Sequence, residues 1–153
     1  MEKFFPNRSA FVTLIACCLV VIIALGIRQT FGLFYFDFST DLDITISQFG
    51  FAMGLQLFLW GAFSPLFGII TDKYGGNIAI FLGFLFFLLG VLLFYSGFNT
   101  GVYFVYTIGV LIGVGLGSTA IGIPVSVVAK HFPASKRTIA TGIVTCAGSF
   151  GYF

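Results

Sequence analysis

The chain has 153 residues, of which 59% are hydrophobic and only 8% are charged, with a formal net charge of +2. A soluble domain typically carries about 25% charged residues, so this composition excludes an ordinary soluble globular protein and predicts a membrane protein. So small a net charge gives no reason to expect nucleic acid as a partner.

Long uncharged runs follow one another along the chain, separated by short polar segments. An α-helix rises 1.5 Å per residue, so about twenty apolar residues cross a hydrocarbon core that is roughly 30 Å thick. We therefore expect an all-α, polytopic transmembrane bundle with four complete spans and the start of a fifth. The expected spans are 10–36, 48–71, 78–97 and 101–129, and the fifth begins at 138.

The first run also has features of a secretory signal. Leu14-Ile15-Ala16-Cys17 matches the short box that precedes a lipid-modified cysteine, and Lys3 and Arg8 come before it. However, the apolar part ahead of Cys17 has only about seven residues, and the run continues for about nine more without a polar break. A membrane span is the better interpretation.

Lys and Arg outside the spans fall on one side of the predicted membrane. Cytoplasmic loops hold the excess of both residues, so we expect a multi-pass protein of the cell inner (plasma) membrane with a cytoplasmic N-terminus. The loop at 37–47 then faces outward, and we expect its carboxylates, Asp37, Asp41 and Asp43, to be solvated. The residues that set this orientation are Lys3, Arg8, Lys73, Lys130, Lys136 and Arg137.

The fifth apolar run has only about fifteen residues, which is short of the twenty or so needed for a crossing. Two interpretations stay open: a fragment of a longer protein, or a gene that ends prematurely.

Regularly spaced glycines mark helix faces in three of the spans. Small residues allow membrane helices to approach closely, so plain helix packing explains these glycines without a ligand. Span three has almost no polar side chain, so we expect it to face lipid at the bundle edge, while spans one, four and five line a polar interior. The glycines are Gly50, Gly54, Gly61 and Gly68 in span two, Gly83, Gly90 and Gly97 in span three, and Gly109, Gly113 and Gly117 in span four.

Arg28 is the candidate for the binding of an anion. A charged side chain inside a span costs about 2.5–3.5 kcal/mol on insertion scales, so it usually faces a watery cavity or a partner of opposite charge. Alternatively, Arg28 extends toward the outer loop, or it pairs with Asp37 or Asp41. Hydroxyls in spans four and five would join the site, or else bond to carbonyls of their own helix. The candidate substrate-binding residues are Arg28, Gln29, Tyr35, Thr119, Thr145 and Ser149.

Enzymatic and metal-binding motifs are not found. There is no nucleophile elbow, phosphate loop or metalloprotease box, so we expect no enzyme and no cofactor. The single histidine, His131, lies beside Lys130, and no cysteine has zinc-type spacing with it, so we expect no metal site. Cys17, Cys18 and Cys146 are expected to be small buried side chains.

The stretch Gly68-Ile69-Ile70-Thr71-Asp72-Lys73-Tyr74-Gly75 lies between spans two and three. It resembles the signature loop of the major facilitator superfamily of secondary transporters. The resemblance implies that Gly68 allows close helix contact and that Asp72 lies against the positive N-terminal end of a helix from the other half. It also implies that Lys73 and Gly75 shape the turn.

Three further stretches narrow the resemblance. They are Gly26–Gly32, Lys130–Gly142 and Ala147–Gly151, and they are similar to bacterial monocarboxylate porters and oxalate/formate exchangers. The resemblance implies secondary transport of small organic anions by symport or antiport, with alternating access around a midplane site. This chain would cover about the first third of such a transporter. Its partners would be the lipid bilayer, the anion and the missing C-terminal half, without which it should not transport.

Two alternatives stay open. One is a drug-efflux carrier of the same superfamily. The other is a small membrane assembly partner whose glycine faces dock onto another subunit.

Overall fold

The computed structural model describes residues 7–41, 43–96 and 100–153, and in these ranges the chain is helical with no strand. Four described stretches are long and apolar enough to cross a membrane: Arg8–Leu33, Ile46–Tyr74, Gly76–Tyr95 and Gly101–His131. The expected all-α transmembrane bundle is confirmed. The elements are α1 (Arg8–Leu33), α2 (Tyr35–Asp41), α3 (Ile46–Tyr74), α4 (Gly76–Tyr95), α5 (Gly101–Phe104), η1 (Val105–Leu111), α6 (Ile112–Thr119), α7 (Gly122–His131) and α8 (Ala134–Gly151).

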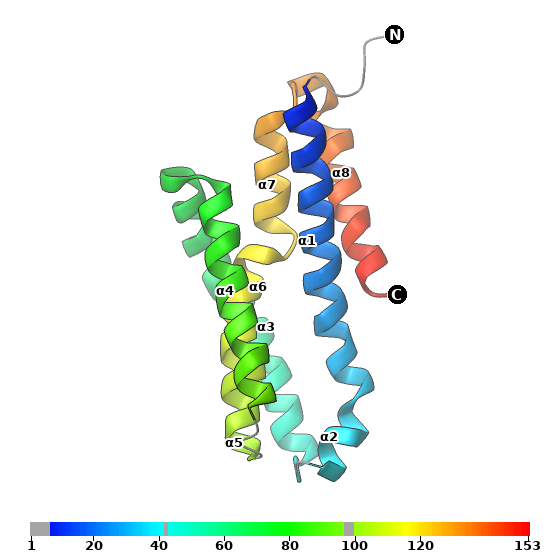
Figure 1. The fold of residues 1–153 in the computed structure, drawn as a ribbon, viewed down its shortest axis with the longest axis vertical. Coiled ribbons are helices and arrows are strands. Elements are labelled where there is room, and N and C mark those ends of the chain that lie inside the picture. Colours follow the sequence, from blue (N-terminus) through cyan, green and yellow to red (C-terminus); the bar gives the residue numbers. More distant parts are fainter. Residues whose placement is uncertain (1–6, 42, 97–99) are drawn as a thin grey trace.

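The bundle is elongated along its helices and has two distinct ends (Figure 1). The basic end is where α1, α4 and α8 begin and where α3 and α7 end. The aromatic end is opposite, where α2 and α5 lie. The described basic residues of the loops are at the basic end, while Lys3 lies outside the described residues: Arg8, Lys73, Lys130, Lys136 and Arg137.

The fourth span is not the uninterrupted helix that we expected over 101–129. The structure divides it into α5, η1, α6 and α7, with Ala120 extended at ψ −165° between the last two. Pro124 accounts for this break, because a proline has no N–H to donate to the carbonyl four residues back, that of Ala120, and its ring clashes with that carbonyl. η1 is a π-helical segment, in which the Ile112 N–H bonds to the Thr107 carbonyl five residues back.

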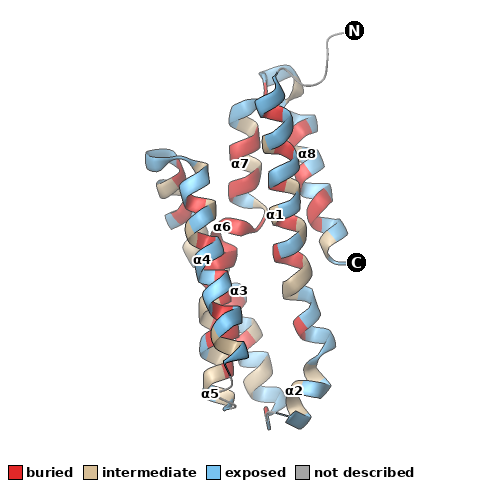
Figure 2. Cartoon of the chain, in the orientation of Figure 1, coloured by how far each residue is buried: buried red, intermediate tan, exposed pale blue. Residues whose placement is uncertain are grey.

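α6 forms the centre of one half of the bundle, and all eight of its residues are buried (Figure 2). Its glycines touch the backbones of both neighbouring helices. A Cβ atom at Gly113 would lie 2.9 Å from the Gln56 Cα on α3, and one at Gly115 would lie 2.8 Å from the Gly83 carbonyl oxygen on α4. The glycines that we expected to pack in spans three and four therefore do so, except Gly97, which lies outside the described residues.

The glycines of α3 do not pack in this way. Gly50, Gly54, Gly61 and Gly68 have no atom within 4 Å of where a Cβ would lie. The expectation of close packing through this face was wrong for the described helices, because spacing identifies a small-residue face but not whether another helix covers it.

α4 has two different sides. Its glycine side packs along α6 and η1, where a Cβ at Gly90 would lie 3.0 Å from the Thr107 carbonyl oxygen. Its other side carries exposed apolar side chains, including Phe81 and Leu92. The expectation of a lipid-facing helix therefore describes one side of α4 only.

Candidate functional site

Arg28 lies on α1 and reaches across to α3. Its guanidinium carbon is 5.8 Å from the centroid of the Trp60 ring, a distance at which the ring face attracts a cation. The side chain is half-buried, and its Nε is buried with no hydrogen-bond partner among the described residues. No ion pair joins Arg28 to Asp37 or Asp41, so the alternative of pairing with the acidic loop is not what the structure shows.

Trp60 lies at the middle of α3, whereas Arg28 lies nearer to the end of α1 at Leu33 than to its start. Trp60 is fourteen residues from either end of α3, which corresponds to about 21 Å of helix. Arg28 is twenty residues from the start of α1, or about 30 Å. The guanidinium therefore lies at the depth of the middle of α3.

The other candidates lie in different environments. Gln29 is exposed, and Tyr35 packs edge-on against Phe49 of α3 at 5.0 Å between ring centroids. Thr145 and Ser149 are on the exposed side of α8, with the Thr145 hydroxyl donating to the Thr141 carbonyl at 3.1 Å.

Thr119 is buried, and its hydroxyl donates to the Gly115 carbonyl at 2.9 Å. The alternative that hydroxyls bond to their own helix therefore holds for Thr119 and Thr145. Arg28 and Tyr35 thus both contact side chains of α3, namely Trp60 and Phe49. No contact is recorded between these two residues and the hydroxyls of Thr119, Thr145 and Ser149.

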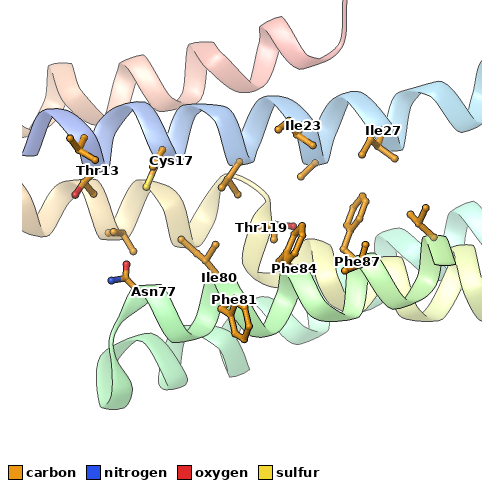
Figure 3. Close-up of a pocket in the computed structure, with 17 residues that line it drawn as sticks. Thr13, Cys17, Ile23, Ile27, Asn77, Ile80, Phe81, Phe84, Phe87 and Thr119 are labelled. Atoms are coloured by element: carbon orange, nitrogen blue, oxygen red, sulfur yellow. The ribbon is translucent and has the colours of Figure 1, made fainter. Parts of the chain in front are cut away.

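A crevice of about 680 Å³ lies between α1 and α4 (Figure 3). Figure 3 shows Ile23 and Ile27 of α1 facing Phe84 and Phe87 of α4, so the crevice is mainly apolar. The polar side chains of its lining are Thr13, Asn77 and Thr119. Arg28 is not part of the lining. This crevice is therefore not the polar interior that we expected spans one, four and five to line.

The signature-loop residues lie at the basic end. The Lys130 Nζ donates to Asp72 Oδ1 at 2.9 Å, and both side chains are more than half exposed, so the pair contributes at most about 1 kcal/mol to stability. Among the described residues the partner of Asp72 is Lys130. The helix N-terminus that the resemblance implied as a neighbour of Asp72 would come from the other half of a transporter, so this contact does not test that prediction. Lys73 Nζ lies 5.1 Å from the Tyr74 ring centroid.

α3 ends at Gly75, which has φ 95° and ψ 153°. Essentially only glycine adopts this conformation, because a Cβ atom would clash with the backbone. The sharp turn between α3 and α4 therefore depends on this glycine. The Gly68 position, in contrast, is open, as described above.

Two residues of α3 were missed by the sequence reasoning. The Trp60 ring lies against the Arg28 guanidinium. Gln56 is fully buried, and its Nε2 donates to the Ile108 carbonyl at 3.0 Å. The available signal was that the two residues are four apart, which puts them on the same face of a helix.

Metal-ligand residues do not cluster in the described part of the chain. Cys17 is buried, but Cys18 is half-buried and Cys146 is exposed. The expectation of three buried cysteines was therefore wrong for Cys146, which lies on the uncovered side of α8.

One comparison with known proteins bears on this arrangement. A family model described as Major Facilitator Superfamily matches residues 16–153. No solved structure matches the chain.

Proposed function

The chain belongs to the major facilitator superfamily, a family of membrane transporters, and from this premise we propose that it is the N-terminal part of a secondary transporter for small organic anions. On this proposal it works by alternating access, through symport or antiport, together with a C-terminal half. The bilayer is its solvent, and small monocarboxylates or dicarboxylates are its substrates.

The observation that carries the proposal is the Arg28–Trp60 pair. A guanidinium that rests with one face on an aromatic ring keeps its N–H groups at the edge, where a carboxylate accepts two parallel hydrogen bonds. The described residues supply no carboxylate to neutralise Arg28. An anionic substrate would supply the missing charge and offset the cost of burying the cation.

Neighbouring polar residues would complete the site. Gln29 follows Arg28 directly, and α8 crosses close to this part of α1, since a Cβ at Gly26 would lie 3.1 Å from the Gly151 carbonyl oxygen. Ser149 and Thr145 precede Gly151 on α8, and their exposed side would face a C-terminal half. Tyr35 and Thr119 are proposed as further substrate contacts.

The orientation belongs to the same proposal. With the basic end in the cytoplasm, the positive-inside rule is met, and the N-terminus is cytoplasmic in the inner (plasma) membrane. The acidic residues Asp37, Asp41 and Asp43 would then face outward.

Uptake into vesicles tests the substrate class. We expect the reconstituted transporter that contains this chain to take up a radiolabelled small carboxylate, and unlabelled carboxylates to compete with it. The uncharged amides of the same acids serve as controls and should not compete. Competition by apolar dyes and none by carboxylates would instead identify a drug-efflux carrier.

A second candidate function is an assembly partner for another membrane subunit. The observation in its favour is the uncovered face of α3 that carries Gly50, Gly54, Gly61 and Gly68. Such a face allows another helix to pack closely. Co-purification of a separate subunit whose association is lost in Gly54→Ile, together with no carboxylate uptake, would favour this function over transport.

A further inference from the structure

Phe104 is the central ring of a cluster that closes the aromatic end. It is 1% exposed, and its ring centroid lies 5.7 Å from Phe38 of α2, 5.8 Å from Phe49 of α3 and 5.9 Å from Phe94 of α4. The Phe104 side chain at the end of α5 thus contacts α2, α3 and α4. Two residues of α2 contact this cluster: Phe38 packs edge-on against Phe94 at 5.5 Å, and Tyr35 packs against Phe49 at 5.0 Å.

The segment that follows Phe104 is the π-helix η1, and a side chain of α3 donates a hydrogen bond to its backbone. In an α-helix the Ile108 carbonyl would accept the Ile112 N–H, but here that N–H bonds to Thr107. The Ile108 carbonyl accepts the Gln56 Nε2 instead, at 3.0 Å. Gln56 is fully buried and its Oε1 has no partner among the described residues, so its amide is committed to this one bond.

A change of register would move α5 rather than α6. Gly109 and Gly113 lie against the backbone of α3, where Cβ atoms would lie 3.2 Å from the Ala52 carbonyl oxygen and 3.0 Å from that of Gln56. Turning α6 would bring larger side chains into these positions. A π-segment that returned to the α-register would therefore turn its other end, α5 with Phe104, by about one residue or 100°.

We infer that Gln56 is a positioning residue whose bond to the Ile108 carbonyl keeps η1 in its π-register, aims Phe104 into the aromatic cluster and so holds α2 over that end of the bundle. Without the amide donor, the buried Ile108 carbonyl regains a partner by accepting the Ile112 N–H, which is the α-register. Gln56 would thereby couple the interior of the bundle to the closure of its aromatic end, whatever the substrate.

Pulsed electron paramagnetic resonance on the chain in lipid nanodiscs tests this coupling. Spin labels at Thr40→Cys on α2 and Tyr95→Cys on α4 report the docking of α2, in a background with Cys17, Cys18 and Cys146 changed to alanine. Both labelled positions are exposed. We expect Gln56→Met, which keeps the size but removes the donor, to shift the distances to longer values. Gln29→Met, the same change at an exposed glutamine, should leave them unchanged.

The register is measured separately by NMR. The contact between the Thr107 Hα and the Ile112 amide proton marks the π-segment, and we expect Gln56→Met to lose it and Phe104→Leu to keep it while α2 still undocks. Should Gln56→Met fail to insert, Gln56→Asn, whose amide is one methylene too short, replaces it with the same expected result. Unchanged distances in a folded variant, or longer distances with the π-contact retained, would overturn the inference.

Discussion

We expect carboxylate uptake to fall about tenfold to a hundredfold at low substrate concentration when Arg28 is changed to Gln. A hydrogen bond to a charged group contributes about 1.5–3 kcal/mol, and each 1.4 kcal/mol is a factor of ten in affinity. Gln keeps a polar side chain on α1 but has neither the charge nor the forked donors of Arg28. Initial rates of uptake by reconstituted vesicles, normalised to the amount of inserted protein, give the measurement.

Two matched variants make this result specific. Arg28→Lys keeps the charge but loses the planar fork and the stacking on Trp60, so we expect uptake between those of the wild type and Arg28→Gln. Arg137→Gln changes an exposed arginine outside the spans and should leave uptake unchanged. Full uptake by correctly inserted Arg28→Gln would remove Arg28 from the substrate site.

We expect Gly83→Leu to separate α4 from α6 and to destabilise the bundle by more than the 1–3 kcal/mol that is roughly typical of overpacking. A Cβ at Gly83 would collide with the Ser118 Oγ and would lie 2.9 Å from the Gly115 carbonyl oxygen. The backbone oxygen cannot move aside without moving α6, which is buried on all sides. A large fall in the thermal midpoint of the purified chain in detergent is the expected result.

Gly61→Leu is the matched control, because nothing lies within 4 Å of a Cβ at Gly61 on α3. Both variants replace a helical glycine by the same side chain, so they differ mainly in what surrounds it. We expect Gly61→Leu to leave the midpoint unchanged or slightly raised. Equal losses in the two variants would contradict the packing of α4 on α6 through glycine.

The apolar runs predict the helices well because the thickness of a bilayer sets the length of a spanning helix, and a run of that length can be seen in the sequence alone. The break in span four was also predictable, since Pro124 lies in the sequence and its effect on the carbonyl four residues back is general. η1 was not predictable in this way. Its register involves a bond from Gln56, which lies 52 residues away in the chain.

The candidate site shows the same division between local and tertiary information. A charge inside an apolar run identifies Arg28. Its contact residue, Trp60, is on another helix, α3, and no spacing within α1 points to it. Glycine spacing likewise identified the faces of α3, α4 and α6, while only packing distinguishes the covered faces from the open one.

The fluorescence of Trp60 tests the central claim most directly, because Trp60 is the single tryptophan of the chain and its ring lies under the Arg28 guanidinium. A carboxylate bound at the guanidinium changes the electric field at the indole. Titration of the purified chain with a small carboxylate should therefore give a saturable change in emission, which is absent with the uncharged amide and absent in Arg28→Gln. No saturable change, or the same change in Arg28→Gln, would contradict an anion site at Arg28.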